Sequence, residues 1–339
     1  MKTDHVTIDD VSTIAGVSKT TVSRYLNGKF EHMSDKTKVK VKKAIDELKF
    51  RPNLTARTLK SQKTNLIGVI VTDIANPAYA HLIRGVIDEC AKEGYQVITA
   101  CSNEEIEREK EYTQAMIDRQ VEGLVVSLVD YNEFSHLENL KEQGARIVLA
   151  DRTISRPVLD IVTTDNYEMT KDAIRYLYGI GFERVALFSP DLLKSKVRFE
   201  RYSAFLNQSK EYVDDPNGIA YVLTEQEDYI SALLDFTTSN PSKRLAAFAS
   251  TPVALLNLLS AVNKNGLDVP TDIGVCGYDN LPWTELISGG ITVVEQPFYE
   301  VGAKSARLLI NKINGHEENG SQYVVLKSKL IVRNSTKNK

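Results

Sequence analysis

Two short helices joined by a tight turn are predicted by the stretch Val6-Thr-Ile-Asp-Asp-Val-Ser-Thr-Ile-Ala-Gly-Val-Ser-Lys-Thr-Thr-Val-Ser-Arg-Tyr-Leu-Asn27. Thr7 and Asp10, three residues apart, form an approximate capping box at the start of the first helix. Gly16 permits the sharp turn, and Ser18 caps the second helix. Ile8, Val11 and Ile14 are expected to form the apolar face of the first helix.

The second helix has a polar and basic outer face. Val22 and Leu26 are expected to face inward, which leaves polar side chains outward: Lys19, Thr20, Ser23 and Arg24. These side chains can donate hydrogen bonds to phosphates or base edges, as in the recognition helix of a DNA-binding helix-turn-helix. A plain helical hairpin is the alternative interpretation.

The charge of the chain is unevenly distributed. A third amphipathic helix is expected from about 34 to 48, and its apolar positions are Val39, Val41, Ala44, Ile45 and Leu48. Residues 1–63 contain 14 Lys and Arg against 7 Asp and Glu, a net charge of +7, whereas the remaining residues carry 28 against 38, or −10. A basic head on an acidic body indicates a DNA-binding module joined to a part that does not touch DNA.

Four strings give the chain its resemblance to a known family: Ala15-Gly-Val-Ser-Lys-Thr-Thr-Val-Ser-Arg-Tyr-Leu-Asn27, Phe50-Arg-Pro-Asn53, Ala56-Arg-Thr-Leu59 and Ile67-Gly-Val-Ile-Val-Thr-Asp-Ile-Ala-Asn-Pro77. With these motifs in this order, nearly end to end, the chain resembles the lactose-repressor (LacI/GalR) family of bacterial transcription regulators. The resemblance implies a homodimer that binds a pseudo-palindromic operator in double-stranded DNA.

The resemblance also implies which residues contact DNA. A short hinge helix after Pro52 would enter the minor groove, with Leu59 as a wedge between bases; ordinary linker packing is the alternative for this leucine. Base edges would be contacted by Lys19, Thr20 and Arg24, and phosphates by Ser18 and Thr21. The full set of DNA-binding candidates is Thr7, Ser18, Lys19, Thr20, Thr21, Ser23, Arg24, Asn27, Asn53, Ala56, Arg57 and Leu59.

From about residue 65, apolar runs typical of buried parallel strands alternate with amphipathic helices. The expected strands are 66–71, 96–100, 123–127 and 146–150, then, in a second lobe, 161–164, 185–189, 220–223, 245–249 and 273–277. The family implies an α/β core like that of periplasmic binding proteins, with two doubly wound lobes behind the all-α helix-turn-helix domain. The expected domains are 1–50 for the helix-turn-helix, 51–63 for the hinge, 64–161 with 291–321 for the first lobe, and 162–290 with 322–339 for the second.

A cleft between two such lobes usually binds a small molecule, and the family implies candidate residues for it. The effector-binding candidates are Tyr79, Asp151, Arg152, Arg198, Arg201, Ser250 and Asp279. Asp279 suits vicinal sugar hydroxyls, or else caps a helix. Arg201 matches the family's ligand arginine, although Ala204 replaces the usual glycine; a surface salt bridge is its alternative. Tyr79 is equally compatible with a role in the apolar core. For Asp151 and Arg152, contact with the ligand and pairing between the lobes are equally compatible with the sequence.

One departure from the family and one cluster bear on the effector. Ser250-Thr251-Pro252 replaces the family's Asn-Asp, so hydroxyls stand where an amide usually contacts ring hydroxyls. Lys194, Lys196, Arg198 and Arg201 gather at one helix start, which favours anions; a solvated face is the alternative. The hypothesis is a sugar acid, such as 2-keto-3-deoxygluconate or a hexuronate, or else a sugar phosphate. A neutral sugar, or a protein corepressor, stays open.

Other classes of protein are disfavoured. The nearest string to a dinucleotide fingerprint, Gly179-Ile-Gly-Phe-Glu-Arg184, fails at its third glycine and precedes a strand, so we expect no enzyme and no cofactor. Three scattered cysteines, with no Cys-x-x-Cys or His-Glu-x-x-His string, predict no metal site. Without a signal-peptide core or an apolar span, we expect a cytoplasmic protein with no membrane partner. The implied mechanism is effector-driven lobe closure that changes operator affinity.

Overall fold

The structure is a computed structural model, which describes residues 6–31, 33–50, 63–156, 158–216, 219–287, 289–316 and 320–337. The chain divides into two compact units, Met1–Thr64 and Asn65–Lys339. Each unit has its own apolar core.

Among its described residues, the first unit has three helices: α1 (Ile8–Ala15), α2 (Lys19–Leu26) and α3 (Asp35–Leu48). Val11, Ala15 and Val22 pack with Val41 and Ala44 in its core. The prediction that Ile14 and Val39 face inward is wrong, because both are exposed. Three-residue spacing falls short of a full helical turn, so the third member of such a series rotates off the buried face, and Ala15 takes its place.

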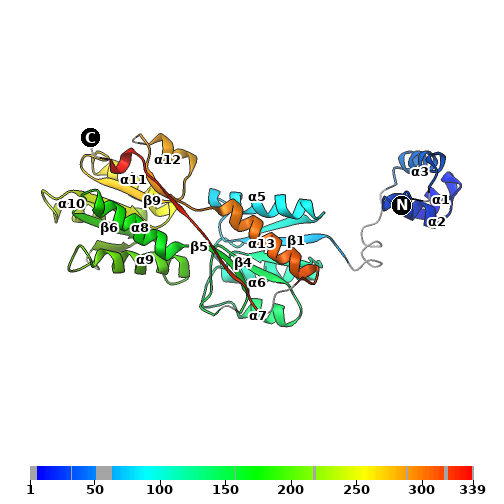
Figure 1. Ribbon diagram of the computed structural model, residues 1–339, viewed down its shortest axis with the longest axis horizontal. Helices are drawn as coiled ribbons and strands as arrows, with labels where there is room; N and C mark the ends of the chain where they lie inside the picture. The colour runs from blue at the N-terminus through cyan, green and yellow to red at the C-terminus, as the bar shows by residue number, and fades with distance from the viewer. Residues whose placement is uncertain are drawn as a thin grey trace. The chain divides into compact units, whose positions relative to one another are not determined.

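The first lobe of the second unit is a parallel sheet with helices on both faces (Figure 1). Its strand order is β2 (Gln96–Cys101), β1 (Leu66–Val71), β3 (Gly123–Val126), β4 (Ile147–Ala150), β5 (Asp160–Thr164), β11 (Tyr323–Leu326). The helices α5 (Pro77–Lys92) and α13 (Phe298–Ile313) cover one face, and α6 (Ile106–Asp118) and α7 (Ser135–Glu142) cover the other.

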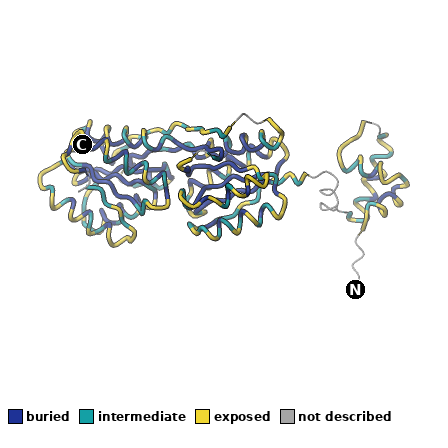
Figure 2. Tube along the Cα trace, turned by 90° about the horizontal axis from the view of Figure 1, so that it is seen from below, coloured by how far each residue is buried: buried dark blue, intermediate teal, exposed yellow. Residues whose placement is uncertain are grey.

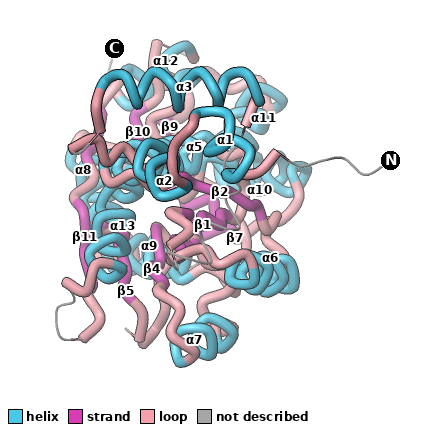
Figure 3. Tube along the Cα trace, turned by 90° about the vertical axis from the view of Figure 1, so that its right-hand side faces the viewer, coloured by secondary structure: helices cyan, strands magenta, loops and turns pink. Residues whose placement is uncertain are grey.

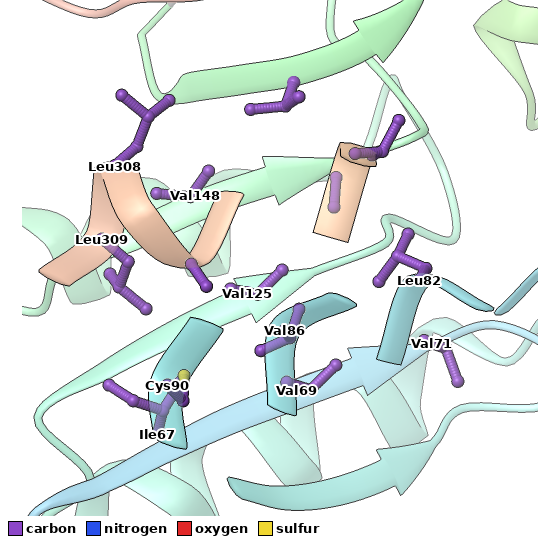
Figure 4. Close-up of a cluster of buried hydrophobic side chains, with 14 of the residues drawn as sticks. Ile67, Val69, Val71, Leu82, Val86, Cys90, Val125, Val148, Leu308 and Leu309 are labelled. Atoms are coloured by element: carbon purple, nitrogen blue, oxygen red, sulfur yellow. The ribbon is translucent and has the colours of Figure 1, made fainter. Parts of the chain in front are cut away.

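Alternation along the strands explains how the first sheet is buried on both faces. In β1, Ile67 and Val69 point to the helices α5 and α13, whereas Ile70 points to α6 and α7. Figure 4 shows the first of these layers, in which Val125 of β3 meets Leu309 of α13. The inner strands of both sheets are accordingly buried, whereas the edge strands are partly exposed, and Figure 2 shows the long buried stretches inside each lobe.

The second lobe repeats this architecture. Its strand order is β7 (Ala220–Val222), β6 (Arg184–Ser189), β8 (Leu245–Ala249), β9 (Gly274–Tyr278), β10 (Thr292–Glu295), β12 (Lys329–Ile331), and only the last pairing is antiparallel. The helices α8 (Asn166–Gly179) and α9 (Lys196–Ser209) lie on one face, and α10 (Gln226–Thr238) and α11 (Pro252–Lys264) on the other. The short helix α12 (Pro282–Leu286) and the 3-10 turn η2 (Asn334–Thr336) complete the lobe.

The predicted bounds of the two lobes, 64–161 with 291–321 and 162–290 with 322–339, place three strands in the wrong lobe. β5 and β11 belong to the first sheet and β10 to the second, so the chain crosses between lobes near residues 165, 296 and 327. The segment 151–159 separates β4 from β5 and looks like a linker between lobes. It instead returns the chain to the first sheet, where β5 pairs with β4 and Val162 lies beside Ala150. Asp165 ties two crossings together, since its amide donates to Leu326 O (3.1 Å) and its carboxylate accepts from Ser328 N (2.8 Å).

The strand order places the functional region. In both sheets the second strand lies outside the first, and the third, fourth and fifth follow on the other side. The direction of winding therefore changes between β1 and β3, and between β6 and β8, and ligands of such sheets bind beyond the carboxyl ends of the strands at this point. Figure 3 shows the packing of helices around these strands.

Candidate functional site

The first unit has the local geometry of a helix-turn-helix. Thr7 Oγ1 accepts from Asp10 N (3.4 Å) while Asp10 Oδ2 accepts from Thr7 N (2.7 Å), which is the predicted capping box. Gly16 adopts φ 63°, in the left-handed region that favours glycine. Ser18 Oγ accepts from Thr21 N (3.2 Å) and so caps α2. These local bonds fix the angle at which α2 leaves the turn.

The helix α2 carries five of the twelve predicted DNA-contact residues. Lys19, Thr20 and Arg24 are exposed, whereas Thr21 and Ser23 are half-buried. Lys19 Nζ lies 2.5 Å from Asp9 Oδ1, and Asn27 Nδ2 donates to Ser23 O (2.8 Å) at the end of the helix. Asn53, Ala56, Arg57 and Leu59 lie outside the described residues.

A cavity in the second unit lies beyond the carboxyl ends of both sheets. It has an empty volume of about 720 Å³, open to solvent. Its lining residues come from both lobes: Asp73, Asn76, Tyr79, Glu104, Asp151, Arg152, Pro190, Ser195, Val197, Arg198, Arg201, Thr251, Pro252, Val253, Asp279, Gln296 and Phe298. This size and this mixture of charged and apolar side chains suit a small polar ligand.

Tyr79 organises the wall from the first lobe. Its hydroxyl accepts from Thr72 Oγ1 (3.0 Å) and Ser127 Oγ (3.1 Å), and donates to Asp151 Oδ2 (3.1 Å). Burial raises the pKa of Tyr79 to about 12, so the hydroxyl keeps its proton. Burial also raises the pKa of Asp151, although Arg152 and Arg201 oppose that shift. One carboxylate is thus held rigidly at the cavity wall.

Arg201 organises the opposite wall. Its Nε and Nη2 donate to Asn166 Oδ1 (2.9 and 2.7 Å), its Nη1 to Ser250 O (2.6 Å), and its Nη2 to Gln296 Oε1 (2.9 Å). The guanidinium stacks 3.5 Å from the ring centre of Tyr278. Arg201 is only 4% exposed, and among the described residues its hydrogen-bond acceptors are all uncharged oxygens.

Gln296 joins this arginine to Asp279. Its Nε2 donates to Asp279 Oδ1 (2.6 Å), and its Oε1 accepts from Thr164 Oγ1 (2.8 Å) of the neighbouring crossing. Burial raises the pKa of Asp279 to about 6, although Arg201 and Gln296 lower it. Asp151 and Asp279 each follow the fourth strand of their sheet, and both have a positive φ (69° and 73°). The two lobes therefore present equivalent carboxylates to one cavity.

Arg152 pairs within the first lobe. It donates twice to Glu104, once at 3.0 Å, and also to the carbonyls of Leu128 and Val129 (3.2 Å each). Arg198, from the second lobe, lies 3.7 Å from Glu104 Oε1, and burial lowers its pKa. Burial alone would raise the pKa of Glu104, but the hydrogen bonds and charge of Arg152 lower it overall.

Six of the seven predicted effector residues line the cavity together. The exception is Ser250, whose side chain is buried and donates to Ser189 Oγ (2.7 Å). The predicted basic cluster divides, because Arg198 and Arg201 face the cavity while Lys194 is exposed and Lys196 donates to Ile154 O (3.0 Å) across the lobes.

Sequence reasoning missed Glu104, Gln296 and Phe298, although the first two are polar residues that closely follow the ends of strands. That position is the signal that could have identified them.

The described residues contain no group of three or more His, Cys, Asp or Glu side chains arranged to hold a metal ion. Within the described ranges, none of the helices combines the length and the apolar character that a membrane span requires.

Comparison with known proteins matches both units. Residues 7–53 match the model of bacterial regulatory proteins of the lacI family, and residues 64–334 match that of periplasmic binding proteins and the sugar binding domain of the LacI family. The HTH-type transcriptional regulator KdgR of Bacillus subtilis (strain 168) is 34% identical over 337 residues, covering 98% of each chain.

Two solved structures are similar over nearly the whole chain. A transcriptional regulator CelR–cellobiose complex has a TM-score of 0.70 at 25% identity, and covers 97% of this chain and 99% of its own. A lac repressor dimer bound to operator and an anti-inducer has a TM-score of 0.81 at 23% identity, and covers 98% and 99%.

Proposed function

Since the chain belongs to the lacI family of bacterial regulatory proteins, and is thus a DNA-binding transcriptional repressor controlled by a small effector and not an enzyme, we propose that its effector is a sugar acid. The observation that carries this proposal is the buried guanidinium of Arg201, whose described acceptors are uncharged oxygens. Buried charges are normally paired. Asp151 and Asp279 interact with the charge of Arg201, but neither accepts a hydrogen bond from it. A carboxylate of the effector beside Arg201 and Arg198 would supply a counter-charge in direct contact.

The remaining groups of the cavity suit a polyhydroxylated ligand. Asp151 and Asp279 present carboxylate oxygens from opposite lobes, and each can accept hydrogen bonds from vicinal hydroxyls. Phe298 and Val253 add apolar lining, against which the C–H face of a sugar packs.

A neutral sugar is the competing candidate, and one observation favours it. Four acidic residues line the cavity, Asp73, Glu104, Asp151 and Asp279, against three arginines, so the cavity has no excess positive charge. The CelR structure in complex with cellobiose shows that a similar fold binds a neutral disaccharide. A sugar phosphate would add two negative charges to a cavity whose acidic residues already outnumber its arginines.

We further propose that α2 contacts the major groove, with Lys19, Thr20 and Arg24 at base edges and Ser18 and Thr21 at phosphates. A cytoplasmic homodimer would bind a pseudo-palindromic operator. The helices α5 and α11 both lie above the sheets in Figure 1, and Ile87 and Leu256 on them are exposed apolar side chains suited to a side-by-side dimer interface. Effector binding would close the lobes and release the operator.

The test is a calorimetric titration of the purified full chain with sugar acids, neutral sugars, sugar phosphates and no ligand. We expect binding of a sugar acid, and a loss of at least about tenfold in affinity for R201M, because a buried charge partner is removed. R201K tests whether the planar fork of the guanidinium matters as well as its charge. R175M is the matched control, since Arg175 lies exposed on α8 beside Asp172.

Binding of neutral sugars alone would contradict the sugar-acid proposal. A weak response to every class would favour a regulator that needs a protein corepressor. Release of an operator, selected from a random duplex pool, is then measured with the ligand that binds.

A further inference from the structure

An unusual turn places Glu104 in the cavity. Asn103 and Glu104, just after β2, have φ values of 52° and 59°. The left-handed region is rarely adopted by residues other than glycine, asparagine and aspartate, so a glutamate there marks a position held by its surroundings. Glu104 N donates to Thr72 O (3.1 Å), which fastens the turn to the end of β1.

Glu104 contacts an arginine from each lobe, and it contacts them unequally. Arg152 donates to both of its carboxylate oxygens and is otherwise bonded to backbone carbonyls, so this arginine is committed within the first lobe. Arg198 Nη2 lies 3.7 Å from Glu104 Oε1 and its Nη1 donates to Asp191 O (3.3 Å), which leaves this guanidinium loosely held. Of the two, only Arg198 is available to a ligand.

We propose that Glu104 is a specificity-determining residue that limits the effector to a single negative charge. Its carboxylate neutralises Arg152 and faces Arg198, so a ligand carboxylate can compete for Arg198 while a doubly charged phosphate monoester is repelled. The inference deepens the proposed function and rests on it, because it concerns the same cavity. Glu104 thus selects ligands by their charge, whereas Asp151 and Asp279 accept hydrogen bonds from their hydroxyl groups.

The experiment compares ligands that differ in charge on one carbon skeleton. Glucuronate, glucose and glucose 6-phosphate form one set, galacturonate, galactose and galactose 6-phosphate another, and 2-keto-3-deoxygluconate with its 6-phosphate a third. Affinities are measured at pH 7.5, where the phosphate is nearly dianionic, for the full chain, E104Q and E104N. E104N is included because asparagine tolerates the left-handed conformation at this position.

We expect the full chain to prefer the acid over the phosphate, and both neutral variants to reduce that preference by about tenfold or more through a gain for the phosphate. E104D, which keeps the charge, should keep the preference. E105Q is the matched control, because Glu105 pairs with Arg108 and is 55% exposed.

An unchanged preference in E104Q and E104N, with melting curves showing folded protein, overturns the inference. If the proposed function itself is wrong, the full chain binds no sugar acid in any of the three sets, and this result distinguishes the two failures. Even then, a gain of phosphate binding in E104Q and E104N that E105Q does not show would support the role of Glu104, and the absence of that gain would refute it.

Discussion

Asp279 is a buried carboxyl group poised to exchange a proton when the cavity fills. Its pKa is raised to about 6 by burial, and Asp151 opposite it is shifted in the same direction. Gln296 holds Asp279 Oδ1 at 2.6 Å whichever protonation state is present, because its amide is a fixed donor. A negative ligand placed near Arg201 would raise the pKa of Asp279 further, so binding and protonation are linked.

We therefore predict that affinity for a sugar acid increases as pH falls from about 8 to about 6. The sign follows because Asp279 is ionised in the empty cavity at pH 8 and becomes neutral below its pKa of about 6, which removes repulsion from the ligand carboxylate. Titration calorimetry in buffers of different ionisation enthalpy measures the proton uptake directly.

The control for this prediction is D279N, in which the amide oxygen still accepts from Gln296 and the left-handed backbone suits asparagine. The variant should lose most of the pH dependence. If affinity instead falls as the solution is acidified, Asp279 must be ionised in the complex, as expected for a neutral sugar whose hydroxyls it accepts.

At the scale of elements, the contact between α5 and α13 depends on two glycines. A Cβ atom on Gly85 would lie 2.0 Å from Tyr299 O, and one on Gly302 would lie 1.9 Å from Leu82 O. Backbone meets backbone at this crossing, so neither helix can yield by a side-chain rotation. α13 follows directly after Gln296, and the crossing therefore positions one wall of the cavity.

The variant G302A is expected to destabilise the second unit by about 1–3 kcal/mol or more, because overpacking forces the backbones apart. Chemical denaturation of the full chain measures this loss. G179A is the comparison, since Gly179 ends α8 with no atom within 4 Å of an added Cβ, and alanine is the better helix former. Equal stability of the two variants would refute the close approach of α5 and α13.

Prediction from sequence succeeded for elements whose signal is local. The strand 66–71 was predicted with its observed ends, because a parallel strand buried on both faces is a continuous apolar run. A helix start was expected near residues 194–201, where α9 begins, but no bounds were predicted for α9 or α10. β5, β10 and β11 were assigned to the wrong lobes, since the partner of a strand is decided by register with distant residues, such as Tyr323 with Ile161.

The site shows the same limit. Asp279 and Arg201 were identified through family motifs, and the structure brings both to one cavity. Glu104 and Gln296 have no motif of their own, and only the folded chain shows that they contact arginines from separate elements. Ser250 was placed correctly next to the site, but its hydroxyl is consumed by Ser189, which sequence spacing does not reveal.

For the whole molecule, two units with separate cores predict two separable thermal transitions. Among its described residues the first unit has five buried apolar side chains, whereas the second has four large clusters. Calorimetry of the full chain measures the midpoint temperature of each transition. An effector at about 100 times its Kd should raise the midpoint of the larger transition by several degrees, and operator DNA should raise the midpoint of the smaller one.

The variant R24A separates the two effects. Removing an exposed arginine from α2 should abolish the shift caused by operator DNA and leave the shift caused by the effector unchanged. A single transition that moves with both ligands would show instead that the units unfold together.

The interleaved path of the chain also has a consequence for biosynthesis. β11, at residues 323–326, closes one edge of a sheet whose first strand begins at residue 66, and the cover of that sheet includes Leu308 and Leu309 of α13. During synthesis on the ribosome, one apolar face of the first lobe therefore stays partly uncovered until α13 has emerged. Unfinished chains would expose Val69, Val125 and Val148, surfaces of the kind that chaperones bind and that drive aggregation.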